Sequence, residues 1–212
     1  MSLWDAFRYT LRIPTNVILI IASALGYFYF AGVQTFGIVY FRGWYGVSHS
    51  AATLLVTVLA AGAILGVLSG GRLADRMVRA GRLDGRIVVG GWSYILATVC
   101  FVPALVSHSL VLSLPLFLVA AAALAARNPP LDAARLDVMH SRLWGRAEAV
   151  RTVLRRAGVA SAPLLFGLLA DTVNAGRRQP TAGQHGFGAN ASPVGLHAAL
   201  LTLLVTLGAV GC

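Results

Sequence analysis

The sequence predicts an all-α integral membrane protein, for three reasons. The chain of 212 residues is 58% hydrophobic and only 11% charged, with a mean hydropathy of +0.77. A soluble domain carries about 25% charged residues, and a fold of this size leaves too much surface in water to hide so much apolar area. The apolar residues also gather in runs of about 20, the length of a membrane-crossing helix, without the alternation of a transmembrane strand. These observations exclude a soluble enzyme, a disordered tail and a disulfide-linked secreted domain.

Six apolar segments are predicted to cross the membrane, and they form one domain over residues 16–212. Their predicted bounds are residues 17–40, 51–69, 87–105, 110–126, 147–169 and 196–211. Residues 1–15 are predicted to form an amphipathic cytoplasmic lead-in, which Pro14 separates from the first span. A cleaved signal peptide, with Ala22-Ser23-Ala24 as its cleavage site, is the alternative. The apolar run continues through Tyr27 to Phe30, which favours the span.

The charge distribution predicts the orientation in the membrane. All 17 basic residues are arginines, there are seven acidic residues, and the net charge is +10. With the N-terminus inside, ten loop arginines lie on the cytoplasmic side and three outside, so both termini are predicted to be cytoplasmic, in the plasma membrane. The inside group is Arg8, Arg12, Arg72, Arg76, Arg79, Arg82, Arg86, Arg135, Arg142 and Arg146, and the outside group is Arg42, Arg177 and Arg178. Clusters between apolar runs indicate an anionic bilayer surface as the partner, and no nucleic acid.

The segment after the second span carries the first candidate site. It contains Gly71, Leu73, Asp75, Arg76 and Arg82. An aspartate at the cytoplasmic end of a helix can pair across helices in one conformation and separate in another, because a partly buried charge is costly to leave unpaired. A small residue such as Gly71 lets helices approach closely. The alternative is that the arginines are only orientation signals and that Asp75 is a solvated or capping group.

The second candidate site follows the fourth span, which is predicted to continue through a proline break to about residue 138. Pro129 and Pro130 free nearby carbonyl groups, and such backbone is tolerated at membrane depth only inside protein or beside a water-filled cavity. Arg127, Asn128 and Asp132 are therefore cavity candidates, the last two on one helix face. The alternative is a helix that ends near residue 126, with these residues at the membrane interface.

Two further groups of residues are candidates. Arg146 and Arg151, at the start of the fifth span, are predicted to meet Asp75, although local ion pairing with Glu148 is the alternative. Tyr27 and Gln34 lie seven residues apart in the first span and are predicted to present polar groups to the cavity. Simple aromatic packing is the alternative for this region.

Two of these motifs resemble the major facilitator superfamily of transporters. Its signature is Gly-x-Leu-Ala-Asp-Arg-x-Gly-Arg, and residues 71 and 73–76 of this chain match it. Val78 then replaces the second glycine, and Gly81-Arg82 follow after an insertion. Residues 142–147 resemble the turn before the penultimate helix of the C-terminal half, with Trp144 where arginine is common. The lead-in and the aromatic first span resemble that C-terminal half, in the Spinster-like branch.

The resemblance implies half of a twelve-helix transporter that moves a small-molecule substrate by alternating access, driven by an ion gradient. The first and fourth helices would line the cavity, the second and fifth would face the second half, and the third and sixth would pack outside. The sequences GRLAD at residue 71 and GLLAD at residue 167 each close the second helix of a three-helix unit. This similarity predicts a 3+3 inverted repeat.

Six helices alone cannot enclose a two-sided cavity, so a second six-helix half is the predicted partner. A non-transporting membrane scaffold or assembly subunit, or an inactive truncated transporter fragment, is the alternative. The sequence carries no enzyme signature, its five histidines lack metal-ligand spacing, and Cys100 and Cys212 have no histidine partner nearby. No enzymatic activity, metal or cofactor is predicted.

Overall fold

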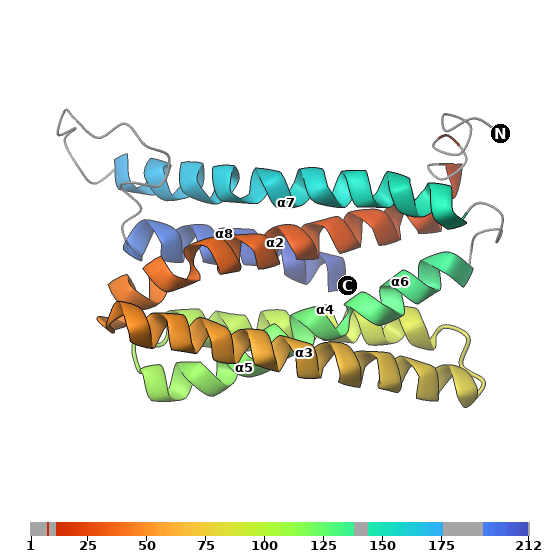
Figure 1. Ribbon diagram of the computed structural model, residues 1–212, viewed down its shortest axis with the longest axis horizontal. Helices are drawn as coiled ribbons and strands as arrows, with labels where there is room; N and C mark the ends of the chain where they lie inside the picture. The colour runs from red at the N-terminus through yellow and green to blue at the C-terminus, as the bar shows by residue number, and fades with distance from the viewer. Residues whose placement is uncertain (1–7, 9–11, 138–143, 176–192, 212) are drawn as a thin grey trace.

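The computed structural model describes residues 8, 12–137, 144–175 and 193–211, which are helical apart from short turns (Figure 1). The helices are α2 (Pro14–Tyr45), α3 (His49–Arg79), α4 (Gly85–Val106), α5 (Leu110–Ala126), α6 (Asn128–Asp137), α7 (Trp144–Ala175) and α8 (Pro193–Gly211). The described residues contain no strand. The predicted all-α class is therefore confirmed. Most of the predicted lead-in lies outside the described residues.

Within the described residues, five helical stretches are long and apolar enough to cross a membrane. They are Pro14–Tyr45, His49–Arg79, Gly85–Val106, Leu110–Asp137 and Glu148–Val173. A sixth apolar stretch, Val194–Ala209, is shorter. This pattern is that of a multi-pass membrane protein, as the composition predicts.

Turn residues set the ends of the first helices. Pro14 occupies the first turn of α2, where its missing N–H costs nothing, and Gly46 ends that helix with a positive φ of 65°. The hydroxyl of Ser48 then caps α3 by accepting from the backbone N–H of Ala51 at 3.3 Å. Because α3 continues to Arg79, the signature residues 71–76 form its last turns, and the chain reverses only at Gly81, with a φ of 87°.

The proline pair interrupts the fourth span between α5 and α6. Pro129 and Pro130 have no N–H to donate back to Ala125 and Ala126, and helical bonding resumes where the N–H of Leu131 donates to the carbonyl of Arg127 at 3.2 Å. The chain direction changes at this point, and α6 continues toward the end of the bundle at which α3 ends (Figure 1). Arg127 itself lies at the break.

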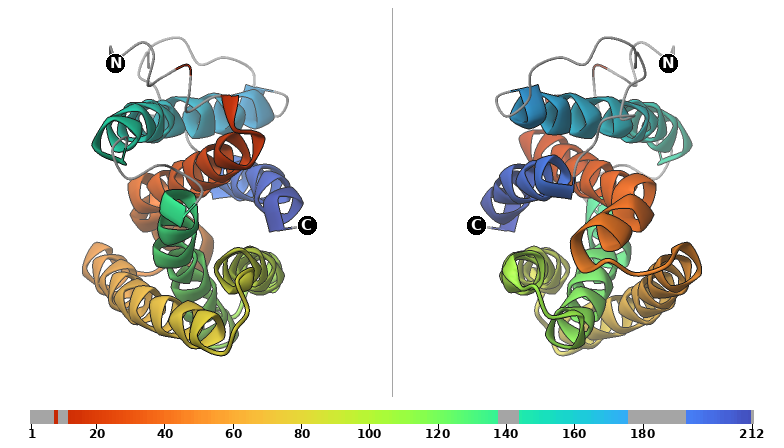
Figure 2. Two further views of the ribbon diagram at one scale, coloured as in Figure 1. Left: turned by 90° about the vertical axis from the view of Figure 1, so that its right-hand side faces the viewer. Right: turned by 90° about the vertical axis from the view of Figure 1, so that its left-hand side faces the viewer.

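The helices pack in pairs around α2 and the α5–α6 segment. α3 and α4 pack on α5, α7 packs on α2, and α8 packs on α4, α7 and α2. Figure 2 shows α7 and α3 at opposite edges of the bundle, with α4 and α8 together on one side. The apolar window of α2 and that of the α5–α6 segment are each 50% buried, whereas those of α3 and α7 are only 28% and 22% buried. The two edge helices therefore leave most of their surface open to lipid or to another protein.

Candidate functional site

Arg127 is a buried cation in the middle of the bundle. Its side chain is 1% exposed, and its Nη1 donates to the hydroxyl of Tyr94 on α4 at 2.8 Å. The hydroxyl of Tyr94 in turn donates to the carbonyl of Ala22 on α2. Gly26 makes the space, because a Cβ at this position would overlap the guanidinium group. The break between α5 and α6 thus directs an arginine into a site that α2 and α4 are shaped to hold.

Aromatic rings rather than carboxylates surround this cation. The guanidinium carbon lies 4.8 Å from the ring centroid of Tyr94 and 5.2 Å from that of Tyr27. The ring of Tyr27 is also 4.8 Å from the guanidinium of Arg155 on α7. We call these four residues the Arg127 cluster. No ion pair among the described residues includes either arginine, and the Nε of Arg127 has no hydrogen-bond partner. Cation–π contacts offset part of the cost of burying the charge.

A second group of charges joins α6 to α7. Arg135 is 2% exposed and pairs with Glu148, while Arg151 is 4% exposed and pairs with both Asp132 and Glu148. The Nη1 of Arg151 lies 2.8 Å from Oε1 of Glu148. We call these four residues the α6–α7 network. Its arginines are buried, but Asp132 and Glu148 are 38% and 44% exposed. The acidic partners are thus partly open to the surroundings of the bundle.

The network corrects one sequence-based expectation, because Arg151 does not meet Asp75 in this conformation. Asp75 is exposed at the end of α3, and its backbone carbonyl accepts from Nε of Arg79 at 3.2 Å. Among the described residues, its carboxylate takes part in no ion pair. The reason is that α3 and α7 lie at opposite edges of the bundle (Figure 2). The side chain of Arg146 lies outside the described residues.

The remaining candidates belong to neither group. Arg76 and Arg82 are exposed at the same end as Asp75, and Leu73 is 52% exposed on α3. Asn128 is half-buried beside the break, and its Oδ1 has no hydrogen-bond partner. Gln34 is exposed two turns along α2 from Tyr27, at a small apolar pocket that α2, α3, α4 and α5 line.

Close helix packing depends on glycines other than Gly71. A Cβ at Gly71 would meet the Cβ of Pro129 at an ordinary 3.5 Å, whereas at Gly66 and Gly70 it would collide with the carbonyls of Ala122 and Ala126. Gly62 continues this stripe against Leu118. The stripe was missed in the sequence, although its spacing of four residues is a recognised signal for close helix contact in membranes.

Two members of the Arg127 cluster, Tyr94 and Arg155, were not candidates either, because nothing local marks Tyr94 within its span.

Among the described residues, no group of three histidine, cysteine, aspartate or glutamate side chains is placed to hold a metal ion. The buried arginines of the described bundle, Arg127, Arg135 and Arg151, belong to the Arg127 cluster and the α6–α7 network. Both involve the helix that follows the proline break or the residue at the break itself.

Comparison with known proteins identifies the fold. Neither a protein-family model nor a curated protein sequence matches this chain. The chain is similar to the crystal structure of a bacterial homologue of the human lysosomal transporter Spinster, in an inward-facing and unoccupied conformation, with a TM-score of 0.76 and 21% sequence identity. The similarity covers 98% of this chain and 48% of that chain, so this chain spans about half of the length of the solved transporter. The chain therefore has the fold of one half of a major facilitator superfamily transporter.

Proposed function

We propose that this chain is one half of a secondary transporter, which moves a small molecule across the plasma membrane by alternating access. The observation that carries the proposal is the match of nearly the whole chain to half of a transporter. The second six-helix half would complete the cavity, and an ion gradient would drive the movement. The arginine distribution supports cytoplasmic termini for this half.

The burial pattern supports the proposed roles of the helices. α2 and the α5–α6 segment are the most buried spans and would line the cavity. α3 and α7 flank them at the two edges and leave most of their surface open, so they would face the second half. α4 and α8 pack together on the other side and would lie outside.

Neighbour relations also support the proposed 3+3 inverted repeat. α2 packs on α7 as α5 packs on α3, and α8 packs on α2 as α4 packs on α5. An exchange of the first three spans with the last three would leave this set of contacts unchanged. The repeat would place the substrate site near the midplane, where the two units meet.

The Arg127 cluster would be the substrate-binding part of this half. Two guanidinium groups share the ring of Tyr27, and neither has a carboxylate partner among the described residues. Arginine binds carboxylate and phosphate groups through charge-assisted hydrogen bonds. A substrate that carries one negative group would supply the partner that the described residues lack. Asn128 and Asp132, near the break, would bind its polar parts.

Transport by the complete two-half protein tests the function. We expect concentrative uptake into proteoliposomes for at least one compound of a panel that contains matched anionic and neutral molecules. Arg127→Gln should raise KM at least tenfold for the transported anion, because one charged hydrogen bond is worth about 1.5 kcal/mol or more. The matched control is Arg72→Gln, since Arg72 is exposed on α3. A folded protein that moves no compound of the panel under any ion gradient would contradict the proposal and favour a membrane scaffold.

The proposed cytoplasmic gate has its own test. Asp75 and Arg76 are exposed at the end of α3, where they would pair with the second half in one conformation. Asp75→Asn should slow transport several-fold and change the accessibility of engineered cysteines on both membrane faces. Unchanged transport together with unchanged accessibility would remove Asp75 from the mechanism.

A further inference from the structure

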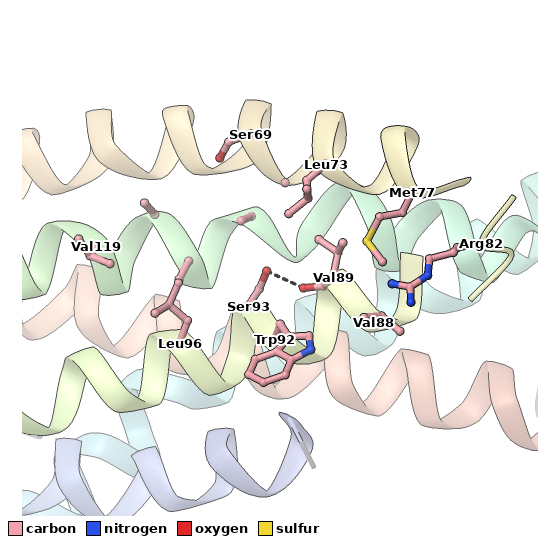
Figure 3. Close-up of a pocket in the computed structure, with 14 residues that line it drawn as sticks. Ser69, Leu73, Met77, Arg82, Val88, Val89, Trp92, Ser93, Leu96 and Val119 are labelled. Carbon is pink, nitrogen blue, oxygen red and sulfur yellow. Dashed lines mark hydrogen bonds between the residues drawn. The ribbon is translucent and has the colours of Figure 1, made fainter. Parts of the chain in front are cut away.

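A groove on the outer side of α3, α4 and α5 lies apart from the Arg127 cluster. Its volume is about 530 Å³, and Figure 3 shows α3 and α4 as its walls with α5 between them. Small residues of α5, such as Ala122 and Ala126, form the floor, because the glycine stripe of α3 lies close against them. None of the four residues of the Arg127 cluster lines this groove.

The walls of the groove are apolar and require no polar ligand. Leu73, Trp92 and Leu96 are 52%, 66% and 47% exposed along it. The two wall hydroxyl groups are used within their own helices, since Ser69 donates to the carbonyl of Gly66 at 3.0 Å and Ser93 donates to that of Val89 at 2.7 Å. Contact with an acyl chain would cost these groups nothing, whereas water in the groove would be unfavourable.

One end of the groove is cationic. Figure 3 shows Arg82 at this end, near Met77 and Val88. The turn after α3 holds it there, because the N–H of Arg82 donates to the carbonyl of Met77 at 3.0 Å and Gly81 supplies the positive φ. No ion pair among the described residues includes Arg82. A guanidinium without a partner, at the end of an apolar groove on a membrane helix, matches a phosphate headgroup with its acyl chain.

We propose that this groove is a binding site for an anionic phospholipid, with the phosphate on Arg82 and one acyl chain between α3 and α4. The lipid comes from the cytoplasmic leaflet, which carries the anionic lipids and which the arginine distribution assigns to this end of the bundle. Trp92 lies on the exposed wall, where its indole meets the lipid. The site goes beyond the proposed transport function and depends only on insertion of the chain in a bilayer.

Quenching of Trp92 by brominated lipid tests the site. The full protein is placed in phosphatidylcholine bilayers with a minor fraction of either phosphatidylglycerol or phosphatidylcholine that carries brominated chains. We expect brominated phosphatidylglycerol to quench more than brominated phosphatidylcholine at the same fraction, and Trp92→Phe to remove the excess. The difference between Trp92→Phe and the unchanged protein isolates Trp92 from the three other tryptophans.

Variants then separate headgroup from chain. Arg82→Gln should lower the preference for phosphatidylglycerol about fivefold, since one arginine near an anionic surface contributes about that factor. Arg82→Lys should keep most of the preference, and Ser69→Phe should reduce quenching by both lipids because it fills the groove. Arg72→Gln is the matched control, because Arg72 is exposed on the same helix but does not line the groove.

Three results would overturn the proposal. Equal quenching by the two lipids would show that no headgroup is selected. An equal loss in Arg82→Gln and Arg72→Gln would assign the preference to the general charge of this membrane face. Absence of quenching by either lipid would show that a protein segment covers the groove. Transport by the complete protein can persist in each of these cases, so failure here is distinguishable from failure of the transport function.

Discussion

The contact between α3 and α5 and the contact between α6 and α7 hold neighbouring spans together in opposite ways. Gly66 and Gly70 of α3 lie against the backbone of α5, so no side chain separates the two helices there, and Gly62 lies against the side chain of Leu118. α6 and α7 instead meet through the long side chains of the α6–α7 network. Backbone contact permits one geometry, whereas ion pairs between long side chains can break and re-form when water reaches them. The bundle thus combines a rigid helix pair with an adjustable one, and the adjustable pair includes the helix after the proline break.

The largest expected effect comes from the rigid contact. Gly70→Ala or Gly66→Ala adds a methyl group that would collide with a carbonyl of α5, so the helices must separate. We expect a loss of about 3 kcal/mol in the free energy of unfolding, at the upper end of the cost of overpacking. The measurement is unfolding of the purified chain in mixed dodecyl sulfate micelles.

The neighbouring glycine supplies the control for this prediction. Gly71→Ala places its methyl group at an ordinary distance from Pro129 and should change stability by less than about 0.5 kcal/mol. If Gly70→Ala and Gly71→Ala lower the free energy of unfolding equally, then the contact between α3 and α5 is not the rigid contact that this comparison requires.

Breaking the α6–α7 network should cost less. Arg135→Met leaves Glu148 without one of its two arginine partners. Loss of one partner of a buried pair costs about 3–5 kcal/mol, but Glu148 is 44% exposed and water can replace part of the contact. We therefore expect a loss of about 2 kcal/mol. The double variant Arg135→Met with Glu148→Gln should recover part of it in a double-mutant cycle, and strict additivity would show that the pair is not coupled.

Much of this fold follows from the sequence, because apolar runs of about 20 residues have few alternatives once lipid is the solvent. The same composition argument explains why Tyr27 and Arg127 were found as cavity candidates, since both stand out within apolar spans. The ion-pair partners on other helices were harder to predict from the sequence. Helical periodicity places Glu148 and Arg151 on one face, and they do pair at 2.8 Å. It does not state which helix lies opposite, and so Asp132 rather than Asp75 is the partner of Arg151 on the neighbouring helix. The inverted repeat and the roles of the site residues stay predictions.

The hydrogen bonds of Tyr94 should contribute less to the free energy of unfolding than the α6–α7 network and more than an exposed ion pair. They connect three spans through one hydroxyl group. Tyr94 donates to the carbonyl of Ala22 and accepts from Arg127. Tyr94→Phe keeps the ring beneath the guanidinium but removes the hydroxyl, and the buried charge loses its hydrogen-bonded partner. We expect a loss of about 1.5 kcal/mol, the value of a hydrogen bond to a charged group. Tyr40→Phe is the matched control, since its hydroxyl is also buried and donates to a neutral acceptor, the carbonyl of Leu105, at 3.3 Å. An equal loss in the two variants would mean that the charge of Arg127 adds nothing.

The smallest expected effect concerns the ion pair that joins α6 to α4. Arg86 pairs with Asp137 at the end of the bundle, where the two side chains are 22% and 57% exposed. Water and salt screen such a pair, and holding two flexible side chains in one geometry costs entropy. Asp137→Asn should therefore lower the free energy of unfolding by about 0.5 kcal/mol or less, and the difference should vanish at high salt. A loss as large as that of Arg135→Met would show that exposure does not separate these contacts. In that case α6 would be held to α4 as strongly as to α7.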